Sequence, residues 1–393
     1  MRKVLEGSIA VAEAVKACRP HVISAYPITP QTHIVEGLAK MVADGELKAE
    51  FVNVESEFAA ASVVLGASAA GARVYSATTS QGLLQMNEVL YNIAGMRLPV
   101  VICGVNRAVS APLNIWNDQQ DTISVRDAGW IQLYAENNQD VMDLHIQAYR
   151  IAEDHRVLLP VLVCMDGFVL THTFEPVEIP DQEKVDKFLP PYKPLYKLTP
   201  KEPLTFGMYA GPDCYMEFRY MLQEAMERAA GVIEEVAEEF AEIFGRYSGG
   251  LIEEYYTEDA ETVIISLGSV VETIKEVVDK QRAAGKKVGC LKIRAYRPFP
   301  ADRIRQALRN AKRIAVLEKC ISIGALPPVA TDVRAAFQSA GGGPEISAFV
   351  AGLGGRDIPS ESIEKIIEQV ESGQKDLTFV DLQKELLEEE VTA

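Results

Sequence analysis

The sequence predicts an α/β protein in which a mainly parallel sheet is followed by a second, smaller α/β domain. Three observations support this fold class. Strand-like and helix-like segments alternate with short connections from residue 7 to about residue 175. The strand-like segments are continuous apolar runs, which is typical of parallel strands buried on both faces. A second alternating region runs from about residue 260 to 372, after a proline-rich segment.

The first alternating region begins with a predicted helix and ends with a predicted strand. The expected strands are short apolar runs: 21–26, Phe51–Val54, Val74–Ala77, Val100–Val105, Ile131–Tyr134 and Val161–Met165. The expected helices show helical spacing of apolar residues: Ser8–Cys18, His33–Val42, Glu57–Ala70, Leu83–Ala94 and Val141–Glu153. The helix over Glu57–Ala70 has so few large side chains that a neighbouring helix or a bound cofactor is expected against its backbone.

Residues 176–212 are rich in proline and show little periodicity, which predicts an extended arm on the surface or on a partner. A long amphipathic helix, Tyr215–Phe244, follows this arm. The expected elements of the second region are the strands Val263–Leu267, Val288–Ile293, Arg313–Leu317 and Ile346–Val350 and the helices Val270–Ala284, Ala301–Ala311 and Ile363–Val370. Because 393 residues exceed one typical core, we expect two domains, 1–250 and 251–393, the second with an acidic tail.

Composition excludes some partners. The formal net charge of −17 argues against nucleic acid or an anionic membrane surface, since both attract basic patches. The six cysteines are scattered without a C-x-x-C pair, so no local iron–sulfur or zinc motif is present and we expect no metal ligand in this chain. The longest apolar run, Val157–Met165, is too short to span a bilayer. These features predict a cytoplasmic, soluble protein with reduced thiols.

Polar motifs follow four of the expected strands, at the edge where open α/β sheets bind their ligands. They are Tyr26–Thr32, Glu55-Ser56-Glu57, Thr79–Gly82 and Asn106-Arg107. Each of these motifs has both a structural and a functional interpretation.

Thr29 followed by Pro30 predicts a helix start, in which the hydroxyl caps free amides and the proline suits the first turn. Such a start also attracts carboxylates or phosphates. Glu55 and Glu57 either complement a helix dipole or place a proton-exchanging acid in an apolar pocket. Arg107 either bridges an acidic neighbour or binds a planar carboxylate.

The order of these motifs resembles the 2-oxoacid:ferredoxin oxidoreductases. The matching motifs are Tyr26-Pro27-Ile28-Thr29-Pro30, Glu55-Ser56-Glu57, Thr79-Ser80-Gln81-Gly82, Asn106-Arg107-Ala108, Asp166-Gly167-Phe168, Tyr215–Tyr220, Arg297-Pro298-Phe299-Pro300 and Gly352–Asp357. The resemblance covers nearly the whole chain. Within this family, the chain is most similar to the alpha subunit of the multi-subunit enzymes that act on pyruvate. It implies a pyrimidine-type thiamine-diphosphate-binding domain and a transketolase C-terminal-like domain.

The resemblance also implies an activity, cofactors and partners. The enzyme would convert pyruvate and CoA reversibly to acetyl-CoA and CO2 and reduce ferredoxin, in anaerobic metabolism. A beta subunit would hold the diphosphate of the cofactor with Mg2+ and a [4Fe-4S] cluster, and a ferredoxin-like or gamma subunit would carry further clusters. In agreement, this chain lacks a G-D-G…N motif, of which Asp166-Gly167 is the nearest fragment.

Site residues follow from the resemblance, position by position. Glu57 would contact the ring nitrogen of the cofactor's aminopyrimidine and be catalytic, whereas Glu55 would belong to the helix start. Thr29 and Arg107 would position the pyruvate carboxylate. The turn Ser80-Gln81-Gly82 would approach the cofactor ring. Arg297–Pro300 and Gly352–Asp357 would be structural or lie at a subunit interface.

Three alternatives stay open at this stage. The same family acts on other 2-oxoacids, namely 2-oxoisovalerate, 2-oxoglutarate or oxalate. Thr29 favours a small substrate with one carboxylate, because no second arginine stands near Pro30 or Gln31. A non-catalytic scaffold subunit would not need to retain Thr29, Glu57 and Arg107. A complete transketolase-type enzyme in one chain lacks its diphosphate motif here.

Overall fold

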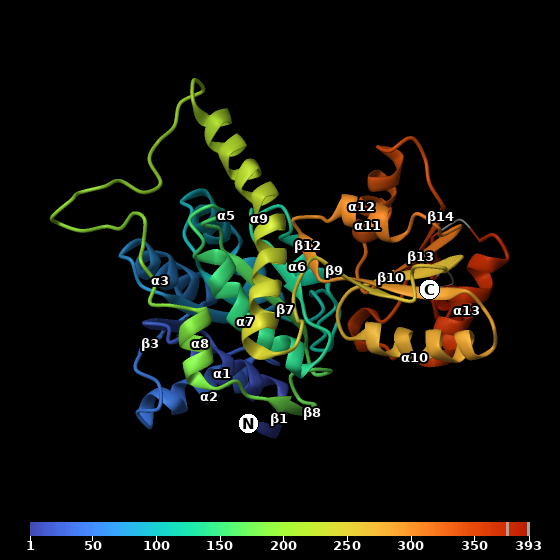
Figure 1. The fold of residues 1–393 in the computed structure, drawn as a ribbon, viewed down its shortest axis with the longest axis horizontal. Coiled ribbons are helices and arrows are strands. Elements are labelled where there is room, and N and C mark those ends of the chain that lie inside the picture. The colour runs from blue at the N-terminus through green and yellow to red at the C-terminus, as the bar shows by residue number, and fades with distance from the viewer. Residues whose placement is uncertain (375–376, 391–393) are drawn as a thin grey trace. The chain divides into compact units, whose positions relative to one another are not determined.

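The computed structural model describes residues 1–374 and 377–390 (Figure 1). The chain divides into two compact units. Unit 1 comprises Met1–Glu253, Leu267–Ser269 and Ile293–Pro300, and unit 2 comprises Glu254–Ser266, Val270–Lys292 and the chain from Ala301 on. The predicted α/β class with mainly parallel sheets is confirmed, while the domain limits 1–250 and 251–393 stay a prediction.

Unit 1 is built on a seven-stranded sheet with the strand order β12-β6-β7-β5-β4-β2-β3. All neighbours pair in parallel except β12 with β6, which are antiparallel. The strands are β2 (Val22–Ala25), β3 (Glu50–Asn53), β4 (Val74–Thr79), β5 (Val101–Asn106), β6 (Ile131–Tyr134), β7 (Val161–Asp166) and β12 (Ala295–Arg297). Every residue of β4, β5 and β7 is buried, as expected for parallel strands that are covered on both faces.

The helices of unit 1 follow the predicted alternation closely. Helix α3 contacts β2 and β4, and α7 contacts β5 and β7. The helices are α1 (Gly7–Cys18), α2 (Thr32–Ala43), α3 (Glu57–Ala69), α4 (Ser80–Gln85), α5 (Asn87–Gly95), α6 (Gln120–Ser124), α7 (Asn138–Ala152), α8 (Gln182–Phe188) and α9 (Tyr215–Phe244). The segment predicted as one helix from Leu83 is therefore two helices, α4 and α5, of which α4 already begins at the end of β4.

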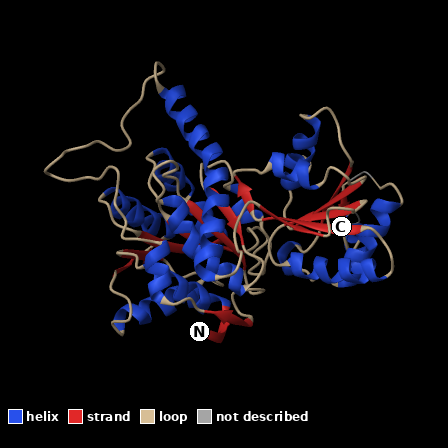
Figure 2. Cartoon of the chain, in the orientation of Figure 1, coloured by secondary structure: helices blue, strands red, loops and turns tan. Residues whose placement is uncertain are grey.

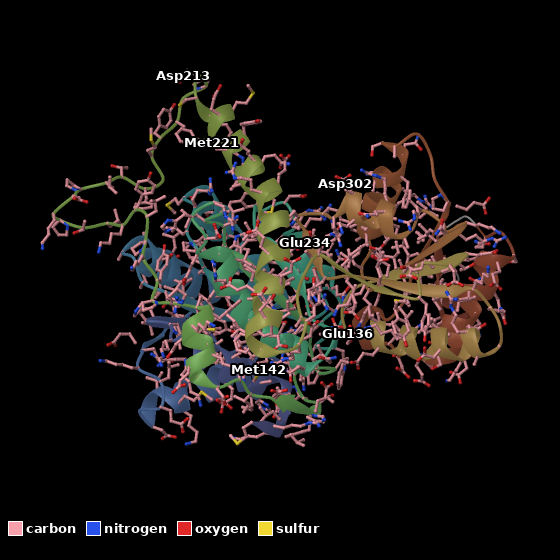
Figure 3. All side chains as sticks on the ribbon, in the orientation of Figure 1. Glu136, Met142, Asp213, Met221, Glu234 and Asp302 are labelled. Carbon is pink, nitrogen blue, oxygen red and sulfur yellow. The ribbon has the colours of Figure 1, made fainter. Side chains whose placement is uncertain are left out.

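The segment 176–212, predicted as an extended arm, contains regular elements at its start. Its start belongs to β8 (Phe174–Glu178), which pairs antiparallel with β1 (Arg2–Glu6), and α8 follows. Residues 189–214 form the extended part, which contains one isolated bridge between Thr199 and Glu202. Helix α9 begins at its end, and Figure 3 shows Asp213 and Met221 on this projecting segment of unit 1.

Unit 2 has a six-stranded sheet with the order β15-β14-β13-β10-β11-β9. Its core strands β11, β10, β13 and β14 pair in parallel. Helices α10 and α13 cover one face and α11 and α12 the other (Figures 1 and 2). The elements are β9 (Ile252–Tyr255), β10 (Thr262–Ser266), α10 (Val270–Ala283), β11 (Val288–Ile293), α11 (Ala301–Ala307), β13 (Arg313–Glu318), α12 (Pro328–Gln338), β14 (Glu345–Val350), the short 3-10 helix η1 (Leu353–Gly355), α13 (Ser360–Glu371), β15 (Thr378–Phe379) and α14 (Glu385–Glu390).

Helices long and apolar enough to cross a membrane are absent from the described parts of the chain.

Candidate active site

The strand order of unit 1 reverses at β2. From β2 the chain continues to β3 on one side, and it then returns to β4 on the other side of β2. In open parallel sheets the loops on either side of such a reversal separate, and the carboxyl ends of the strands there form the ligand site. The turn Tyr26–Gln31 follows β2, and Ser80–Gly82, the first turn of α4, follows β4, so two of the predicted motifs lie at this point.

The turn after β2 is fixed by Gln31, not by the predicted cap. Helix α2 begins at Thr32 without a side-chain cap, so the prediction that Thr29 caps this helix is wrong. The buried Gln31 side chain accepts a hydrogen bond from the Ile28 N–H (3.2 Å) and donates one to the carbonyl of Ala77 in β4 (2.6 Å). The turn is therefore tied to the neighbouring strand, and Thr29 stays exposed at its tip.

A buried carboxylate, Asp121, organises the ends of β4 and β5. Its Oδ2 accepts hydrogen bonds from the backbone N–H of Ser80 (2.9 Å) and of Arg107 (3.0 Å). Its Oδ1 accepts from Asn106 Nδ2 (3.0 Å) and from the Thr122 N–H (2.7 Å). Ser80 has a positive φ of 46°, an unfavourable backbone conformation for a residue with a side chain, and this N–H bond helps to hold it there.

Burial raises the pKa of Asp121 to about 7, although its hydrogen-bond donors act in the opposite direction. The desolvation of the charge outweighs the donors because the side chain is fully buried. Sequence reasoning missed this residue. It stands at the end of the long 107–121 loop, and only the folded chain brings the N–H groups of Ser80 and Arg107 to it.

Arg107 is a buried cation whose guanidinium contacts neutral oxygens. Its Nη1 donates to the backbone carbonyl of Thr29 (2.8 Å), its Nε to that of Asn114 (3.2 Å) and its Nη2 to Gln81 Oε1 (3.4 Å). Across the described residues, its guanidinium forms no direct ion pair with a carboxylate. The acidic neighbour is Asp121, which accepts a hydrogen bond from the Arg107 N–H (3.0 Å) and acts on the guanidinium only at longer range. Burial lowers the pKa of Arg107, although the Asp121 carboxylate acts in the opposite direction. A partly desolvated guanidinium of this kind is well suited to an anionic ligand.

Glu57 begins α3, directly after the cap Ser56, whose hydroxyl accepts from the Ala59 N–H (3.2 Å). The Glu57 side chain is 7% exposed, and within the described structure no donor or cation pairs with its carboxylate. Gly82 lies against it: a Cβ at Gly82 would come within 2.6 Å of Glu57 Oε1 and 2.7 Å of Thr78 Oγ1. Glycine is therefore required for the close approach of the 80–82 turn to the acid.

All predicted site residues thus lie in one connected group. Arg107 links Thr29 to Gln81, the Ser80 hydroxyl donates to Gln81 Oε1 (2.5 Å), and Gly82 contacts Glu57. Glu55, which the resemblance places outside the site, is exposed. Buried polar atoms without a hydrogen-bond partner are found around this group, namely Thr78 Oγ1, Thr79 Oγ1, Gln81 Nε2 and Asn106 Oδ1. Unpaired buried groups are costly, and in native proteins they indicate a ligand or water.

Asp166-Gly167, the fragment of a diphosphate motif, has another use in this chain. The Asp166 carboxylate accepts hydrogen bonds from Gln119 Nε2 (3.2 Å) and from the Ser269 N–H (3.0 Å) and hydroxyl (2.5 Å), which hold internal segments of unit 1 together. Gly167 allows close packing, since a Cβ there would lie 2.5 Å from the Asn106 carbonyl oxygen and 2.8 Å from Pro30 Cγ.

Comparison with known proteins identifies the family. The family model described as pyruvate flavodoxin/ferredoxin oxidoreductase, thiamine diphosphate-binding, matches residues 13–238. The match includes every residue of the connected group above, the strand-end group: Thr29, Glu57, Ser80, Gln81, Gly82 and Arg107. The model of the pyruvate:ferredoxin oxidoreductase core domain II matches residues 260–363. The chain belongs to the 2-oxoacid:ferredoxin oxidoreductase family. The resemblance seen in the motifs, to the alpha subunit of these enzymes, is confirmed.

Curated relatives of this oxidoreductase subunit match over almost their full length. The pyruvate synthase subunit PorA of Methanosarcina barkeri is 52% identical over 391 residues, with 98% of this chain and 97% of the relative covered. PorA of Methanothermobacter thermautotrophicus is 51% identical, with 98% and 99% covered. The ketoisovalerate oxidoreductase subunit VorA of Pyrococcus horikoshii is 44% identical, with 96% of each chain covered.

A solved structure shares the fold of this subunit. It is a 2-oxoglutarate:ferredoxin oxidoreductase from Magnetococcus marinus with 2-oxoglutarate, coenzyme A and succinyl-CoA bound, with a TM-score of 0.72 and 19% identity. The match covers 94% of this chain and 65% of that chain, so this chain spans about two thirds of its length.

The residues of the strand-end group fit the cofactor of the family. A ring nitrogen that shares a proton would satisfy the unpaired Glu57 carboxylate, and Gly82, which has no Cβ, lets the 80–82 segment pack directly against this carboxylate. Thr78 Oγ1, Thr79 Oγ1 and Gln81 Nε2 in the same group are buried and without a hydrogen-bond partner. These residues suit the ring end of thiamine diphosphate.

Proposed function

We propose that this chain is the alpha subunit of an enzyme that oxidatively decarboxylates pyruvate with CoA. The reaction breaks the bond between the carboxylate and the 2-oxo carbon, releases CO2, and forms a thioester between the acetyl group and the CoA sulfur. The electron pair left by this oxidation passes to ferredoxin, and the reaction is reversible. The observation that carries the proposal is that one group contains both a buried guanidinium bound only to neutral oxygens, that of Arg107, and a buried carboxylate without a donor, that of Glu57.

The chain's own residues take distinct parts in this proposal. Glu57 holds a proton at the ring nitrogen of the bound cofactor. Thiamine diphosphate, when bound, supplies the nucleophilic carbon and the electron sink for decarboxylation. Arg107 and Thr29 position the substrate carboxylate. Because this carboxylate must leave as CO2, holding it too tightly would stabilise the ground state, so orientation matters more than affinity.

Pyruvate is supported over the other 2-oxoacids of the family. The PorA relatives are 52% and 51% identical to this chain, against 44% for VorA. The turn after β2 offers the threonine hydroxyl of Thr29 next to Pro30 and Gln31, without a second arginine for a second carboxylate. The alternatives are 2-oxoisovalerate, 2-oxoglutarate and oxalate.

Partner subunits would complete the site. We propose a beta subunit that holds the diphosphate with Mg2+ and a [4Fe-4S] cluster, and a ferredoxin-like gamma subunit with further clusters. The exposed start of α9 and the arm before it support a subunit contact, because large apolar side chains there face solvent: Tyr209 is 89% exposed, Met216 74% and Tyr220 65%. We further propose that the complex works in the cytoplasm, with its cysteines reduced.

The decisive experiment is anaerobic purification of the native complex, followed by reduction of a low-potential dye with CoA and each 2-oxoacid in turn. We expect pyruvate to support dye reduction well above 2-oxoisovalerate, 2-oxoglutarate and oxalate, with cluster-bearing subunits co-purifying. Preference for one of the other acids would replace pyruvate as the substrate. A chain that purifies without partners and without activity would contradict the proposal.

A further inference from the structure

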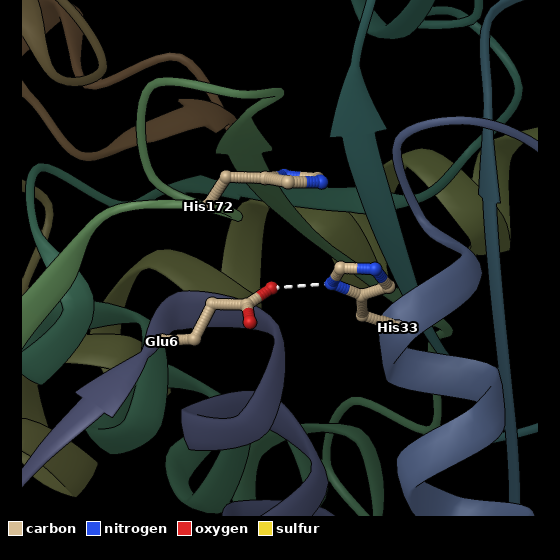
Figure 4. A group of neighbouring side chains, drawn as sticks. All are labelled: Glu6, His33 and His172. Atoms are coloured by element: carbon tan, nitrogen blue, oxygen red, sulfur yellow. Dashed lines mark hydrogen bonds and ion pairs between the residues drawn. The ribbon is translucent and has the colours of Figure 1, made fainter.

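Three metal-binding side chains converge in unit 1, outside the group of Glu57, Thr29 and Arg107. Glu6 ends β1, His33 stands in the first turn of α2, and His172 lies in the turn after β7 (Figure 4). One possible ligand atom from each of the three lies within 4.8 Å of the other two. These three residues are at least 27 residues apart along the chain, so they do not form a local sequence motif.

We propose that Glu6, His33 and His172 bind a divalent first-row transition metal, of which Zn2+ is the representative. Two imidazoles and one carboxylate form a recurrent three-ligand set for Zn2+, with water as the fourth ligand. Nitrogen ligands disfavour Ca2+ and Mg2+, which take oxygen ligands. A metal bound there would crosslink three segments of unit 1: the end of β1, the start of α2 and the turn after β7.

The distances allow a metal after a small adjustment. Tetrahedral Zn2+ with ligands at about 2.0–2.1 Å places its ligand atoms about 3.3 Å apart. Glu6 Oε1 and His33 Nδ1 now share a hydrogen bond of 2.6 Å, drawn in Figure 4, so this pair must open slightly and the third ligand must approach. The side chain of His33 is 44% exposed, which leaves it free to turn and leaves the site accessible to a metal from solvent.

His172 is oriented as metal-binding histidines commonly are. Its Nδ1 forms a hydrogen bond with Thr171 Oγ1 (2.7 Å), which leaves Nε2 as the ring nitrogen for a metal. The Thr171 hydroxyl is itself fixed, since it accepts from the Phe168 N–H (2.8 Å). Outer partners of this kind set the tautomer and the direction of a histidine ligand.

Aromatic packing fixes His172 further and links it to the loop that follows Arg107. The Phe168 and His172 rings lie 4.9 Å apart, and the Trp116 ring lies 4.5 Å from that of Phe168. The His33 ring is 4.8 Å from that of His172. A metal at this position would therefore stiffen a stack of rings that reaches the 107–121 loop.

The test is metal binding by the full chain, stripped of metal and titrated with Zn2+ and, as a spectroscopic probe, with Co2+. We expect one equivalent of Zn2+ per chain, which displaces Co2+, and a rise in the melting temperature on binding. His172→Gln and Glu6→Gln should each weaken Zn2+ binding at least about tenfold, since even outer partners are worth about 10–100-fold.

A matched control comes from His155, an exposed histidine of unit 1 that lies outside the group and contacts the Lys193 carbonyl. His155→Gln should bind Zn2+ as the wild type does. Equal melting temperatures of all variants without metal would show that they are folded. Absence of a stoichiometric Zn2+ site in the wild type, or equal affinity in His172→Gln, Glu6→Gln and the control, would overturn the proposal.

Discussion

The two parallel sheets end in polar side chains that are used differently. In unit 2, Glu318 at the end of β13 accepts hydrogen bonds from the N–H groups of Val329 (2.9 Å) and Ala330 (3.0 Å) at the start of α12. Ser266 at the end of β10 donates to the Leu317 carbonyl (2.7 Å). In unit 1, the Glu57 carboxylate has no hydrogen-bond donor or cation as a partner among the described residues. The Arg107 guanidinium binds neutral oxygens there, while the Arg107 N–H is the group that Asp121 binds. Buried polar groups with a structural role are hydrogen-bonded within the protein, whereas those of a binding site can stay unpaired until a ligand binds.

The sharpest test of this comparison exchanges one carboxylate in each sheet for an amide. Glu57→Gln should reduce pyruvate-dependent dye reduction by about 10²–10⁴-fold, the range for loss of a proton-transferring group, while assembly and melting temperature stay unchanged. Glu318→Gln should do the opposite: it should cost about 1–3 kcal/mol of stability, because the amide nitrogen faces a backbone donor, and leave activity per folded complex intact. Near-wild-type turnover in Glu57→Gln would show that the unpaired Glu57 carboxylate is not needed for catalysis.

A second test asks whether Arg107, the buried cation of unit 1, binds the substrate. Arg107→Ala should raise KM for pyruvate about 10–100-fold, because a hydrogen bond to a charged group contributes about 1.5–3 kcal/mol. Arg107→Lys should raise KM less than Arg107→Ala does. Lysine keeps the positive charge but lacks the planar guanidinium, which binds a carboxylate with two parallel hydrogen bonds. KM and kcat for pyruvate are measured on the assembled complex. A kcat that falls while KM stays unchanged would indicate that Arg107 only supports the loop and the Thr29 carbonyl.

The parts of the site that sequence reasoning recovered are those whose residues follow strands directly. Thr29, Glu57, the 80–82 turn and Arg107 stand at strand ends, and the parallel alternation alone brings such ends to one edge. Asp121 and Gln31 could not be predicted, because their hydrogen bonds join segments that meet only in the fold. The strand β8 was missed because it contains Pro176, which is tolerated in this short two-stranded sheet. The short helix α8 lacks a long apolar pattern, with only Val185 and Phe188 buried.

Asp121 provides a pH-dependent test of the buried charge in unit 1. Its folded pKa of about 7 lies above the usual unfolded value of about 3.9, so the folded state binds the proton more tightly. This group's contribution to the free energy of unfolding should therefore decrease as pH rises from about 4 to about 7. Asparagine at position 121 cannot ionise, so the Asp121→Asn variant should lack this contribution to the change of the free energy of unfolding with pH. The measurement is the melting temperature of wild type and variant complexes between about pH 5.5 and 7.5.

The expected result is that the advantage of the wild type over Asp121→Asn shrinks as pH rises through this window. A difference that stays constant with pH would mean that Asp121 does not titrate there. The variant should also raise KM for pyruvate at every pH, because the amide nitrogen cannot accept from the N–H groups that Asp121 holds at Ser80 and Arg107.

The smallest expected effect separates two glycines, one at the site and one on the outer face of α3. Gly66 is exposed and a Cβ there would meet no atom within 4 Å, so Gly66→Ala should stabilise the helix by about 0.5–1 kcal/mol and leave turnover unchanged. Gly82→Ala should instead displace the Glu57 carboxylate and lower kcat. The two are compared by melting temperature and dye reduction. If Gly66→Ala weakened assembly, the small-residue face of α3 would be a subunit contact, and if Gly82→Ala kept full activity, the close approach to Glu57 would have no catalytic importance.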